Sequence, residues 1–389
     1  MKYIVNTLAL LFVFTACQKA DVVSTELCAY ETPDAFLQHS KAGEFQQLIE
    51  KYVAKGLPGI SALVEDEEGL WVGYAGMADI KNDQPFLPCM PSKAASITKM
   101  MVAAVAFQLQ EEGVWSLDDK LSKYIDADIL DRIANGNEVT LRNCLQHTTG
   151  FYELITDDDF YLAVLNNPNK HWEAEELLRF VYGKDAQFPA NEKAQYTNTN
   201  TLMVAMAMEV ATQRPHSHEL KNRIWMPLQM NDTYYQSREI LPNIVAQGYY
   251  DLYNDGTIVN VSNLITGSGN GYGGVFSTVF DLHKFMKAVF IDKTLLSANS
   301  LAQMTDFIEE DERRDIGVGA LRPFKQWDVI PGVGHTGRDL AYSADMLYFP
   351  DVNDRMMIFF VNYGTDGDTP LRQVFLDFEK EMIQLVQRP

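Results

Sequence analysis

The chain has 389 residues, of which 47% are hydrophobic and 22% charged, as expected for a globular protein with one large domain or two ordinary ones. Its 53 acidic residues outnumber its 32 basic residues, so the formal net charge is −21 at pH 7. Because phosphate binding needs a basic face and the chain has no cluster of Lys and Arg, these values argue against nucleic acid as a partner and against electrostatic docking on an anionic membrane.

The first residues have the features of an export signal. Lys2 supplies a short positive region, and residues 4–14 are mostly apolar but too few to span a bilayer as a helix. Phe14-Thr15-Ala16-Cys17 then resembles the processing site of a bacterial lipoprotein, although leucine is commoner at the position of Phe14. We therefore expect a signal peptide over residues 1–16, a lipidated Cys17 that anchors the chain to a bacterial membrane, and a polar tether over residues 17–44. The alternative is an ordinary secretory signal cut near Ala16. Either signal sends the protein to the periplasm or the cell surface.

Three further cysteines follow Cys17. An exported compartment permits disulfides, and a Cys28–Cys89 bond is one possibility that the spacing does not decide. Cys144 lies in an apolar segment, which favours a buried free thiol. No spacing of Cys and His indicates zinc, and His216 and His218 have no evident third ligand. We expect neither a metal nor any other cofactor.

Two groups of predicted strands are separated by helices. Alternating or continuous apolar runs predict strands at 59–64 and 70–74, and later at 333–335, 341–349 and 356–363. Helices are predicted over residues 45–55, 201–211, 281–290 and 371–386. Strands near both ends predict one sheet built from both ends of the chain. A helical region, about 110–265, is then inserted into a single domain over residues 45–389.

The segment Ser96-Ile97-Thr98-Lys99 places a lysine one helical turn after a serine, so both side chains share one face of a helix. A serine hydroxyl becomes a useful nucleophile when an adjacent base takes its proton. Lysine can be that base if burial lowers its pKa. The residues that follow, Met100 to Phe107 and Leu109, are apolar on all faces and predict a buried helix. The alternative is that Ser96 only caps the helix while Lys99 points to solvent.

Tyr196-Thr197-Asn198 is the second candidate, at the junction of a loop and an apolar helix. A phenol can relay a proton where neighbouring cations hold its pKa down, and Asn198 offers a donor and an acceptor to an amide-like substrate. An exposed loop tyrosine is the alternative. His335-Thr336-Gly337 is the third candidate, at the start of a predicted strand whose edge can line a cleft. Its alternative is a glycine-bounded turn with a solvated histidine.

In this order and wide spacing, the three segments resemble the three motifs of the penicillin-recognising serine hydrolases, in the branch of class C β-lactamases and D-alanyl-D-alanine carboxypeptidases. The segment from Leu141 to Gly150 resembles that family's Leu-Leu-x-His-Thr-Ser-Gly motif. The segment from Gly273 to Leu282 resembles another shared stretch. The similarity is collinear over roughly residues 45 to 385.

The resemblance implies an α+β, β-lactamase/transpeptidase-like fold, with an antiparallel sheet flanked by helices and an all-α region beside it. It implies that Ser96 forms an acyl-enzyme, that Lys99 and Tyr196 share the role of general base, and that Asn198 orients the substrate. His335, Thr336 and Gly337 would line the substrate site. The oxyanion hole would consist of the backbone N–H groups of Ser96 and Arg338. His147 would be structural.

Two positions depart from the family's pattern. Efficient β-lactamases of this branch have Lys-Thr-Gly where this chain has His335-Thr336-Gly337, and histidine there is typical of peptidase and esterase relatives. Any cationic help from His335 should fade as the pH rises. Arg338 replaces a residue that is usually small, and it could narrow the acyl pocket or bind a substrate carboxylate through its fork of donors.

We therefore expect an exported, lipid-anchored serine hydrolase that acts on D-amino-acid peptides or related amides and esters. A β-lactamase is the first alternative. A penicillin-binding sensor or scaffold that is acylated without turnover is the alternative from another class.

Overall fold

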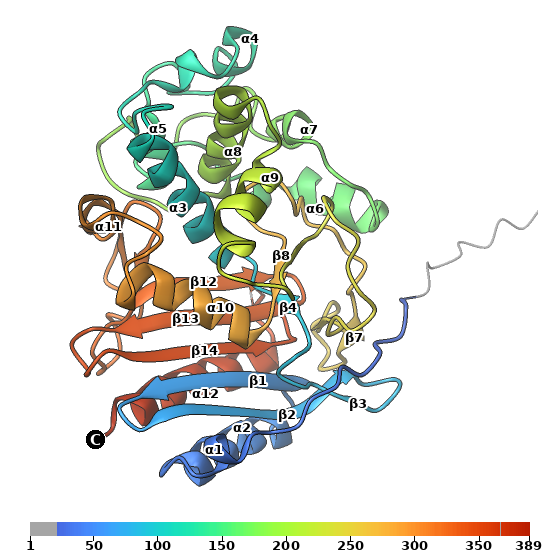
Figure 1. The fold of residues 1–389 in the computed structure, drawn as a ribbon. Coiled ribbons are helices and arrows are strands. Elements are labelled where there is room, and N and C mark those ends of the chain that lie inside the picture. The colour runs from blue at the N-terminus through green and yellow to red at the C-terminus, as the bar shows by residue number, and fades with distance from the viewer. Residues whose placement is uncertain (1–21, 366) are drawn as a thin grey trace, which may run out of the picture.

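The computed structural model describes residues 22–365 and 367–389, which build a nine-stranded antiparallel sheet with helices on both faces (Figure 1). The sheet order is β3-β2-β1-β14-β13-β12-β11-β10-β9. β1 pairs with β14, with Ile60 opposite Val361, so the two ends of the chain meet in one sheet as predicted. The strands are β1 (Gly59–Asp66), β2 (Gly69–Asp79), β3 (Gln84–Pro85), β9 (Ile308–Glu309), β10 (Asp315–Ile316), β11 (Leu321–Arg322), β12 (Val333–Asp339), β13 (Tyr342–Phe349) and β14 (Arg355–Val361).

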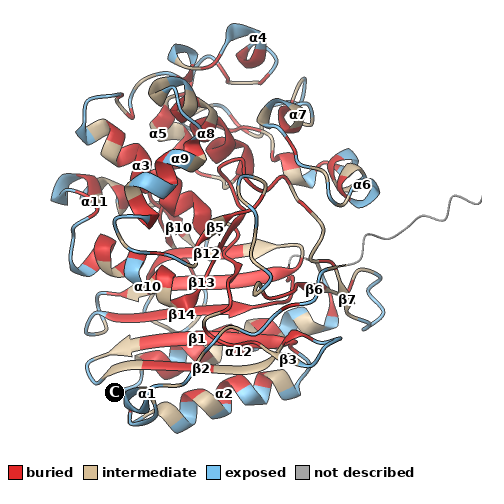
Figure 2. Ribbon diagram, turned by 45° about the vertical axis from the view of Figure 1, so that its right-hand side comes forward, coloured by how far each residue is buried: buried red, intermediate tan, exposed pale blue. Residues whose placement is uncertain are grey.

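The central strands are apolar on both faces because both faces are covered. Alternate residues of β14 belong to two separate cores, Met357 and Phe359 to one and Ile358 and Phe360 to the other. The first core is closed by α2 (Ala42–Ala54) and α12 (Pro370–Gln387), the second by α3 (Ile97–Glu111) and α10 (Val279–Met286). Figure 2 shows the resulting band of buried strands between the two layers of helices.

The helical region above the sheet is less regular than its sequence pattern predicts. Two long helices, α3 and α8 (Asn198–Thr212), are buried on nearly all sides. The other helices are short and joined by irregular segments: α4 (Ala127–Leu130), α5 (Leu141–Leu145), α6 (Asp158–Asn166), α7 (Ala174–Leu178) and α9 (His216–Leu220), with 3-10 turns at Leu121–Lys123 and Leu154–Thr156 and a π-helical turn at Lys221–Trp225.

Several short elements have no clear sequence pattern, because a strand of two or three residues is too short to show a periodicity. A three-stranded sheet, β4 (Ser92–Lys93), β8 (Val275–Ser277) and β5 (Tyr234–Tyr235), joins the segment before α3 to the glycine-rich segment near residue 270. The hairpin β9–β10 and strand β11 extend the large sheet beyond β12. The remaining elements are α1 (Asp34–Leu37), β6 (Tyr249–Tyr250), β7 (Val259–Asn260), α11 (Ala298–Met304) and the π-helical turn Lys287–Ile291.

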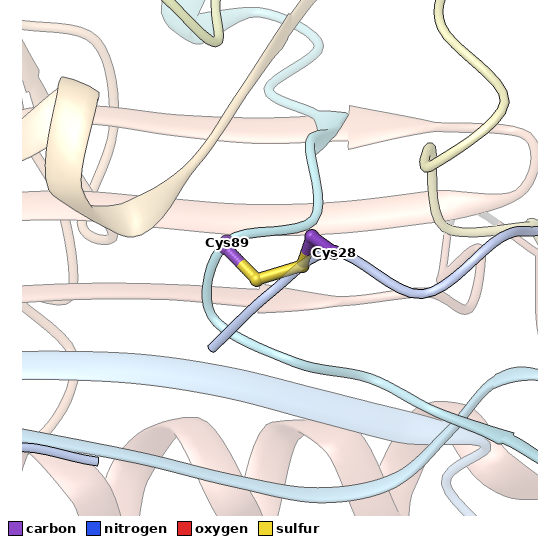
Figure 3. The surroundings of a disulfide bond; sticks show 2 residues. All are labelled: Cys28 and Cys89. Carbon is purple, nitrogen blue, oxygen red and sulfur yellow. A yellow bond between two sulfur atoms is a disulfide. The ribbon is translucent and has the colours of Figure 1, made fainter. Parts of the chain in front are cut away.

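The segment from residue 22 to the start of α2, part of the expected tether, lies against the domain. A disulfide joins Cys28 to Cys89, just before β4 (Figure 3). The backbone N–H of Thr25 donates to Asp79 at 3.1 Å. Cys144 is a buried free thiol, as predicted. The expected signal peptide and Cys17 lie outside the described residues. Within the described part of the chain, no helix is both long enough and apolar enough to cross a membrane.

The disulfide closes a loop of 61 residues and should stabilise the native state by restricting the unfolded chain. Replacing both Cys28 and Cys89 by serine is expected to lower the free energy of unfolding by about 2–4 kcal/mol. The measurement is urea unfolding under oxidising conditions. Reductant should destabilise the natural protein and leave the double variant unchanged. Equal unfolding midpoints for the two proteins would contradict this role.

Candidate active site

Ser96 lies at the N-terminal end of α3, preceded by a strained residue. Its side chain makes no capping hydrogen bond to the helix, and Ala95 before it has φ 48°, a left-handed conformation that is unfavourable for alanine. Lys99, one turn later, is 1% exposed. The alternative of a capping serine beside a solvated lysine is therefore wrong. This part of the helix holds a serine and a buried amine on one face.

Lys99 Nζ has three oxygen neighbours. It lies 3.0 Å from Ser96 Oγ, 2.7 Å from Asn198 Oδ1 and 2.6 Å from the carbonyl oxygen of Tyr272. The amide and carbonyl oxygens can only accept, so they take two N–H hydrogens of the amine. The third neighbour is a hydroxyl, which can donate. As a cation the amine can donate to all three oxygens, and as a neutral amine it can donate to two of them and accept the Ser96 hydroxyl proton with its lone pair.

Burial lowers the pKa of Lys99 to about 7, with Arg314 contributing in the same direction. Glu153 and Asp339 oppose that fall. At pH 7 roughly half of the molecules then hold a neutral Lys99, against roughly one in three thousand for a solvated lysine. Ser96 thus has a proton acceptor at hydrogen-bond distance near neutral pH.

Tyr196 lies between Lys99 and two histidines. Its ring stacks on His147 at 4.5 Å between centroids, and Lys99 Nζ is 5.0 Å from the ring centre. The Tyr196 Oη atom is buried and has no hydrogen-bond partner among the described residues. Burial raises the pKa of the phenol, and the nearby Ser96 and Arg314 side chains partly offset the rise. At neutral pH Tyr196 therefore carries its proton.

His147 fixes the segment that carries Tyr196. Its Nδ1 accepts the backbone N–H of Thr197 at 3.1 Å, so this nitrogen is unprotonated. Burial and the nearby Lys99 hold the pKa of His147 well below its usual range. These contacts agree with the expected structural role.

Asn198 bridges Lys99 to a buried carboxyl group. Its Oδ1 accepts from Lys99, and its Nδ2 donates to Glu153 Oε2 at 3.2 Å. The same Glu153 oxygen accepts the backbone N–H of Asn198 at 2.7 Å. Burial raises the pKa of Glu153. Glu153 therefore orients Asn198, which in turn holds the lysine amine against Ser96.

His335 lies on β12, on the side of the strand that faces α3. It is 2% exposed, and its ring centre is 6.1 Å from that of Tyr196. Burial, with Lys99 nearby, lowers the pKa of His335 to about 3. The expectation of a cationic His335 that loses its charge near neutrality is therefore wrong: this imidazole is neutral across the physiological range.

Arg338 does not present its side chain to the substrate. Its guanidinium donates to Asp345 at 2.8 Å and to Glu379 of α12, on the opposite face of the sheet from Ser96. Because side chains alternate along a strand, Thr336 and Arg338 leave β12 on the other side from His335 and Gly337. The expectation that the Arg338 fork narrows the acyl pocket or binds a substrate carboxylate is wrong.

The backbone of β12 nevertheless reaches Ser96. A Cβ on Gly337 would lie 2.1 Å from the carbonyl oxygen of Ala94, so only glycine permits this approach. Ser96 and Arg338 line the same cleft, as the expected oxyanion hole requires.

This cleft encloses about 390 Å³ of empty space, part of it open to solvent. Its wall combines apolar side chains, among them Ile155, Phe160 and Leu340, with polar ones, among them Asn198 and Asp339. Asp339 is neutralised by Lys93, 3.0 Å away, and accepts from Thr266. Among the described residues, no group of three or more His, Cys, Asp and Glu side chains could hold a metal ion.

The structure therefore brings Ser96, Lys99, Tyr196, Asn198, His335 and Gly337 together. It adds two residues that the sequence motifs do not single out. Glu153 lies three residues after Gly150 of a family-like segment, and that position is the signal that could have found it. Tyr272 contributes a backbone carbonyl, which leaves no trace in the sequence beyond the surrounding glycines.

Comparison with known proteins identifies the family. The profile of the Beta-lactamase family matches residues 45–374, and the chain belongs to this family. It is 24% identical to penicillin-binding protein 4* of Bacillus subtilis (strain 168) over 361 residues, which are 87% of this chain and 75% of that protein. It is 24% identical to protein flp of Staphylococcus aureus (strain MW2) over 216 residues, or 55% of this chain and 42% of that protein.

Solved structures share the fold. A D-stereospecific amidohydrolase from Streptomyces sp. is 25% identical, with a TM-score of 0.74 over 86% of this chain and 97% of that one. A D-amino acid amidase from Ochrobactrum anthropi SV3 is 22% identical, with a TM-score of 0.78 over 90% and 99% of the two chains. The expected α+β, β-lactamase/transpeptidase-like fold is confirmed, and the chain has the fold of a serine hydrolase.

The lysine environment predicts the pH dependence of Ser96 acylation. With neutral Lys99 as the expected base, the rate of acylation should rise with pH and reach half of its plateau near pH 7. Glu153→Gln removes a negative charge that raises the pKa of Lys99, so the half-point should move to lower pH. The measurement is the acylation rate with an activated ester from pH 5 to 9. A half-point that stays in place or rises in E153Q would contradict the arrangement.

Proposed function

We propose that the protein is a serine hydrolase that acts through an acyl-enzyme at Ser96 on amides and esters of D-amino acids with apolar side chains. The observation that carries the proposal is the buried Lys99 amine, which lies 3.0 Å from Ser96 Oγ beside a cleft with both apolar and polar walls. The amidohydrolase and the amidase among the structural neighbours support this reaction type.

Acylation needs one proton acceptor and one proton donor. Lys99 takes the Ser96 proton as Oγ forms a bond to the substrate carbonyl carbon. The backbone N–H groups of Ser96 and Arg338 stabilise the oxyanion, and the second Nδ2 hydrogen of Asn198 binds the substrate. Tyr196, which carries its proton, donates it to the leaving nitrogen or oxygen as that bond breaks, and Lys99 returns a proton to Tyr196.

Deacylation repeats these steps with water. Lys99 accepts a proton from the water as the water oxygen attacks the acyl carbon, and it returns that proton to Ser96 Oγ as the bond to the acyl carbon breaks. The product is a carboxylic acid, which releases its proton to solvent as a free carboxylate. Both steps need only the groups of the site and one water molecule.

The charge of the cleft narrows the substrate class. Among the described residues that line the cleft, Arg338 alone carries a positive charge. The guanidinium of Arg338 is paired with Asp345 and Glu379. His335 is neutral. A substrate with a free carboxylate at the leaving end therefore meets no counter-charge here. We expect neutral amides and esters to react faster than peptides with a free C-terminus.

We also propose that the protein is exported and anchored through lipid on Cys17. The Cys28–Cys89 disulfide supports an oxidising compartment, since disulfides are rare in cytosolic proteins. Mass spectrometry of the mature N-terminus tests this proposal. A mature chain that begins with a diacylglyceryl cysteine at Cys17 is expected. A mature chain that begins with an unmodified residue before or after Cys17 would exclude the anchor.

A substrate panel tests the reaction. D-phenylalanine amide, its p-nitrophenyl ester, a peptide ending in D-Ala-D-Ala and a chromogenic cephalosporin are each incubated with the protein, and Ser96 is examined by mass spectrometry. We expect turnover of the amide and the ester, and at least about tenfold slower reaction of the peptide because its carboxylate is unpaired. Ser96→Ala should abolish turnover, and Ser40→Ala, at an exposed serine, should not change it.

Three results would contradict the proposal. Full activity of S96A would exclude the acyl-enzyme. Rapid turnover of the cephalosporin would favour a β-lactamase. Stable labelling of Ser96 by penicillin without turnover of any ester would favour a non-hydrolytic binder.

A further inference from the structure

A charged hairpin contacts Tyr196, and neither of the two residues that make this contact lines the cleft. The turn between β9 and β10 contains Glu310 and Arg314, and it is closed by a backbone hydrogen bond from Glu310 N–H to the Arg314 carbonyl at 3.3 Å. Neither residue belongs to the motifs discussed above. Both touch the residue that would deliver the proton in the proposed reaction.

The contacts are direct and partly buried. Glu310 Oε1 accepts the backbone N–H of Tyr196 at 2.6 Å and the Nη2 of Arg314 at 3.0 Å. Its other oxygen is bonded to Arg314 Nε, which makes the pair bidentate. The Glu310 side chain is 8% exposed. The Arg314 guanidinium lies 4.8 Å from the centre of the Tyr196 ring, within cation–π range.

The hairpin is itself anchored beside Tyr196. Ile316 of β10 forms a small apolar cluster with Ala194 and Leu321, and Tyr196 packs against this cluster. The carboxylate and the guanidinium therefore have a fixed distance to both the backbone and the ring of Tyr196. A surface ion pair without such support would have little effect on a neighbour.

We propose that the Glu310–Arg314 pair positions Tyr196 for proton transfer to the leaving group, Glu310 by holding its backbone and Arg314 by placing a cation against its ring. This inference rests on the proposed function, because Tyr196 must take part in acyl transfer. It assigns a role to two residues outside the cleft.

The sign of the electrostatic effect follows from the surroundings of Tyr196. The titratable and charged groups that face the phenol come from five segments: Lys99, His147, Glu153, Glu310, Arg314 and His335. The Arg314 cation lowers the pKa of Tyr196 and of Lys99. Glu153 raises both. Arg314 thus makes the phenol a better acid and keeps more of Lys99 neutral.

This role predicts an effect that depends on the leaving group. A p-nitrophenolate leaves without a proton, whereas the nitrogen of an anilide must be protonated as it departs. Loss of Arg314 should therefore slow the anilide more than the ester. A purely structural role would slow both substrates equally.

The experiment compares Arg314→Gln, Arg314→Lys and the matched control Arg313→Gln with the natural protein. Arg313 is the neighbouring arginine, and it is mostly exposed and pairs with Asp311. The substrates are the p-nitroanilide and the p-nitrophenyl ester of D-phenylalanine, and kcat/KM is measured from pH 5 to 9. Melting temperatures show that each variant is folded.

We expect R314Q to lower kcat/KM for the anilide roughly tenfold more than for the ester. The half-point of the ascending limb should move to higher pH, opposite to its shift in E153Q. R314K, which keeps the charge, should recover most of the pH profile, and R313Q should match the natural protein.

Different results would overturn the positioning role and the proposed function. Suppose that the natural protein turns over either substrate through Ser96. If R314Q then lowers kcat/KM equally for both substrates, or has the same kcat/KM as R313Q, the positioning role is overturned and the proposed function stands. If R314Q does not fold, a normal anilide-to-ester ratio in Glu310→Ala, which removes the acceptor of the Tyr196 backbone N–H, overturns it. If S96A retains the activity, or neither substrate acylates Ser96, both proposals fall.

Discussion

The burial of Lys99 without a carboxylate at contact distance is the constraint on which the site depends. Its amine is surrounded by a hydroxyl, an amide oxygen and a backbone carbonyl, none of which compensates a full charge in a desolvated place. The neutral amine becomes accessible near pH 7, and the hydroxyl it faces is Ser96. Placing a carboxylate against the same amine would stabilise the cation and remove the base.

The fold supplies this environment from four distant parts of the chain. α3 carries Ser96 and Lys99, α8 begins at Asn198, the glycine-rich segment contributes the carbonyl of Tyr272, and β12 closes the site with neutral His335. Burial on nearly all faces fixes the positions of α3 and α8. The sheet that joins both ends of the chain fixes the position of β12. Charged side chains are present near Lys99, but they do not contact its amine. Glu153 and Arg314 act on the pKa of Lys99 with opposite signs.

Long elements and motif residues could be predicted from the sequence, because their signals are periodic or spaced. The continuous apolar runs after Ser96 and in β14 reflect burial on all sides. A sheet built from both ends of the chain follows from the positions of the predicted strands. The charge states could not be predicted. His335 titrates near neutrality as an isolated residue, and only its burial beside Lys99 makes it neutral throughout. The engagement of Arg338 with Asp345 and Glu379 depends on β12 turning that side chain away from the cleft. The β9–β10 hairpin is too short to show a pattern, yet it brings Glu310 and Arg314 to Tyr196.

The most direct measurement is the titration of Lys99 itself. In protein labelled with 13C at the lysine Cε, NMR resolves the signal of Lys99, assigned by its absence in Lys99→Arg, and follows it from pH 5 to 10. A midpoint near pH 7 is expected, well below the usual range of solvated lysines. A midpoint of Lys99 close to that of the solvated lysines would show that the amine is charged at neutral pH and would contradict its role as the base.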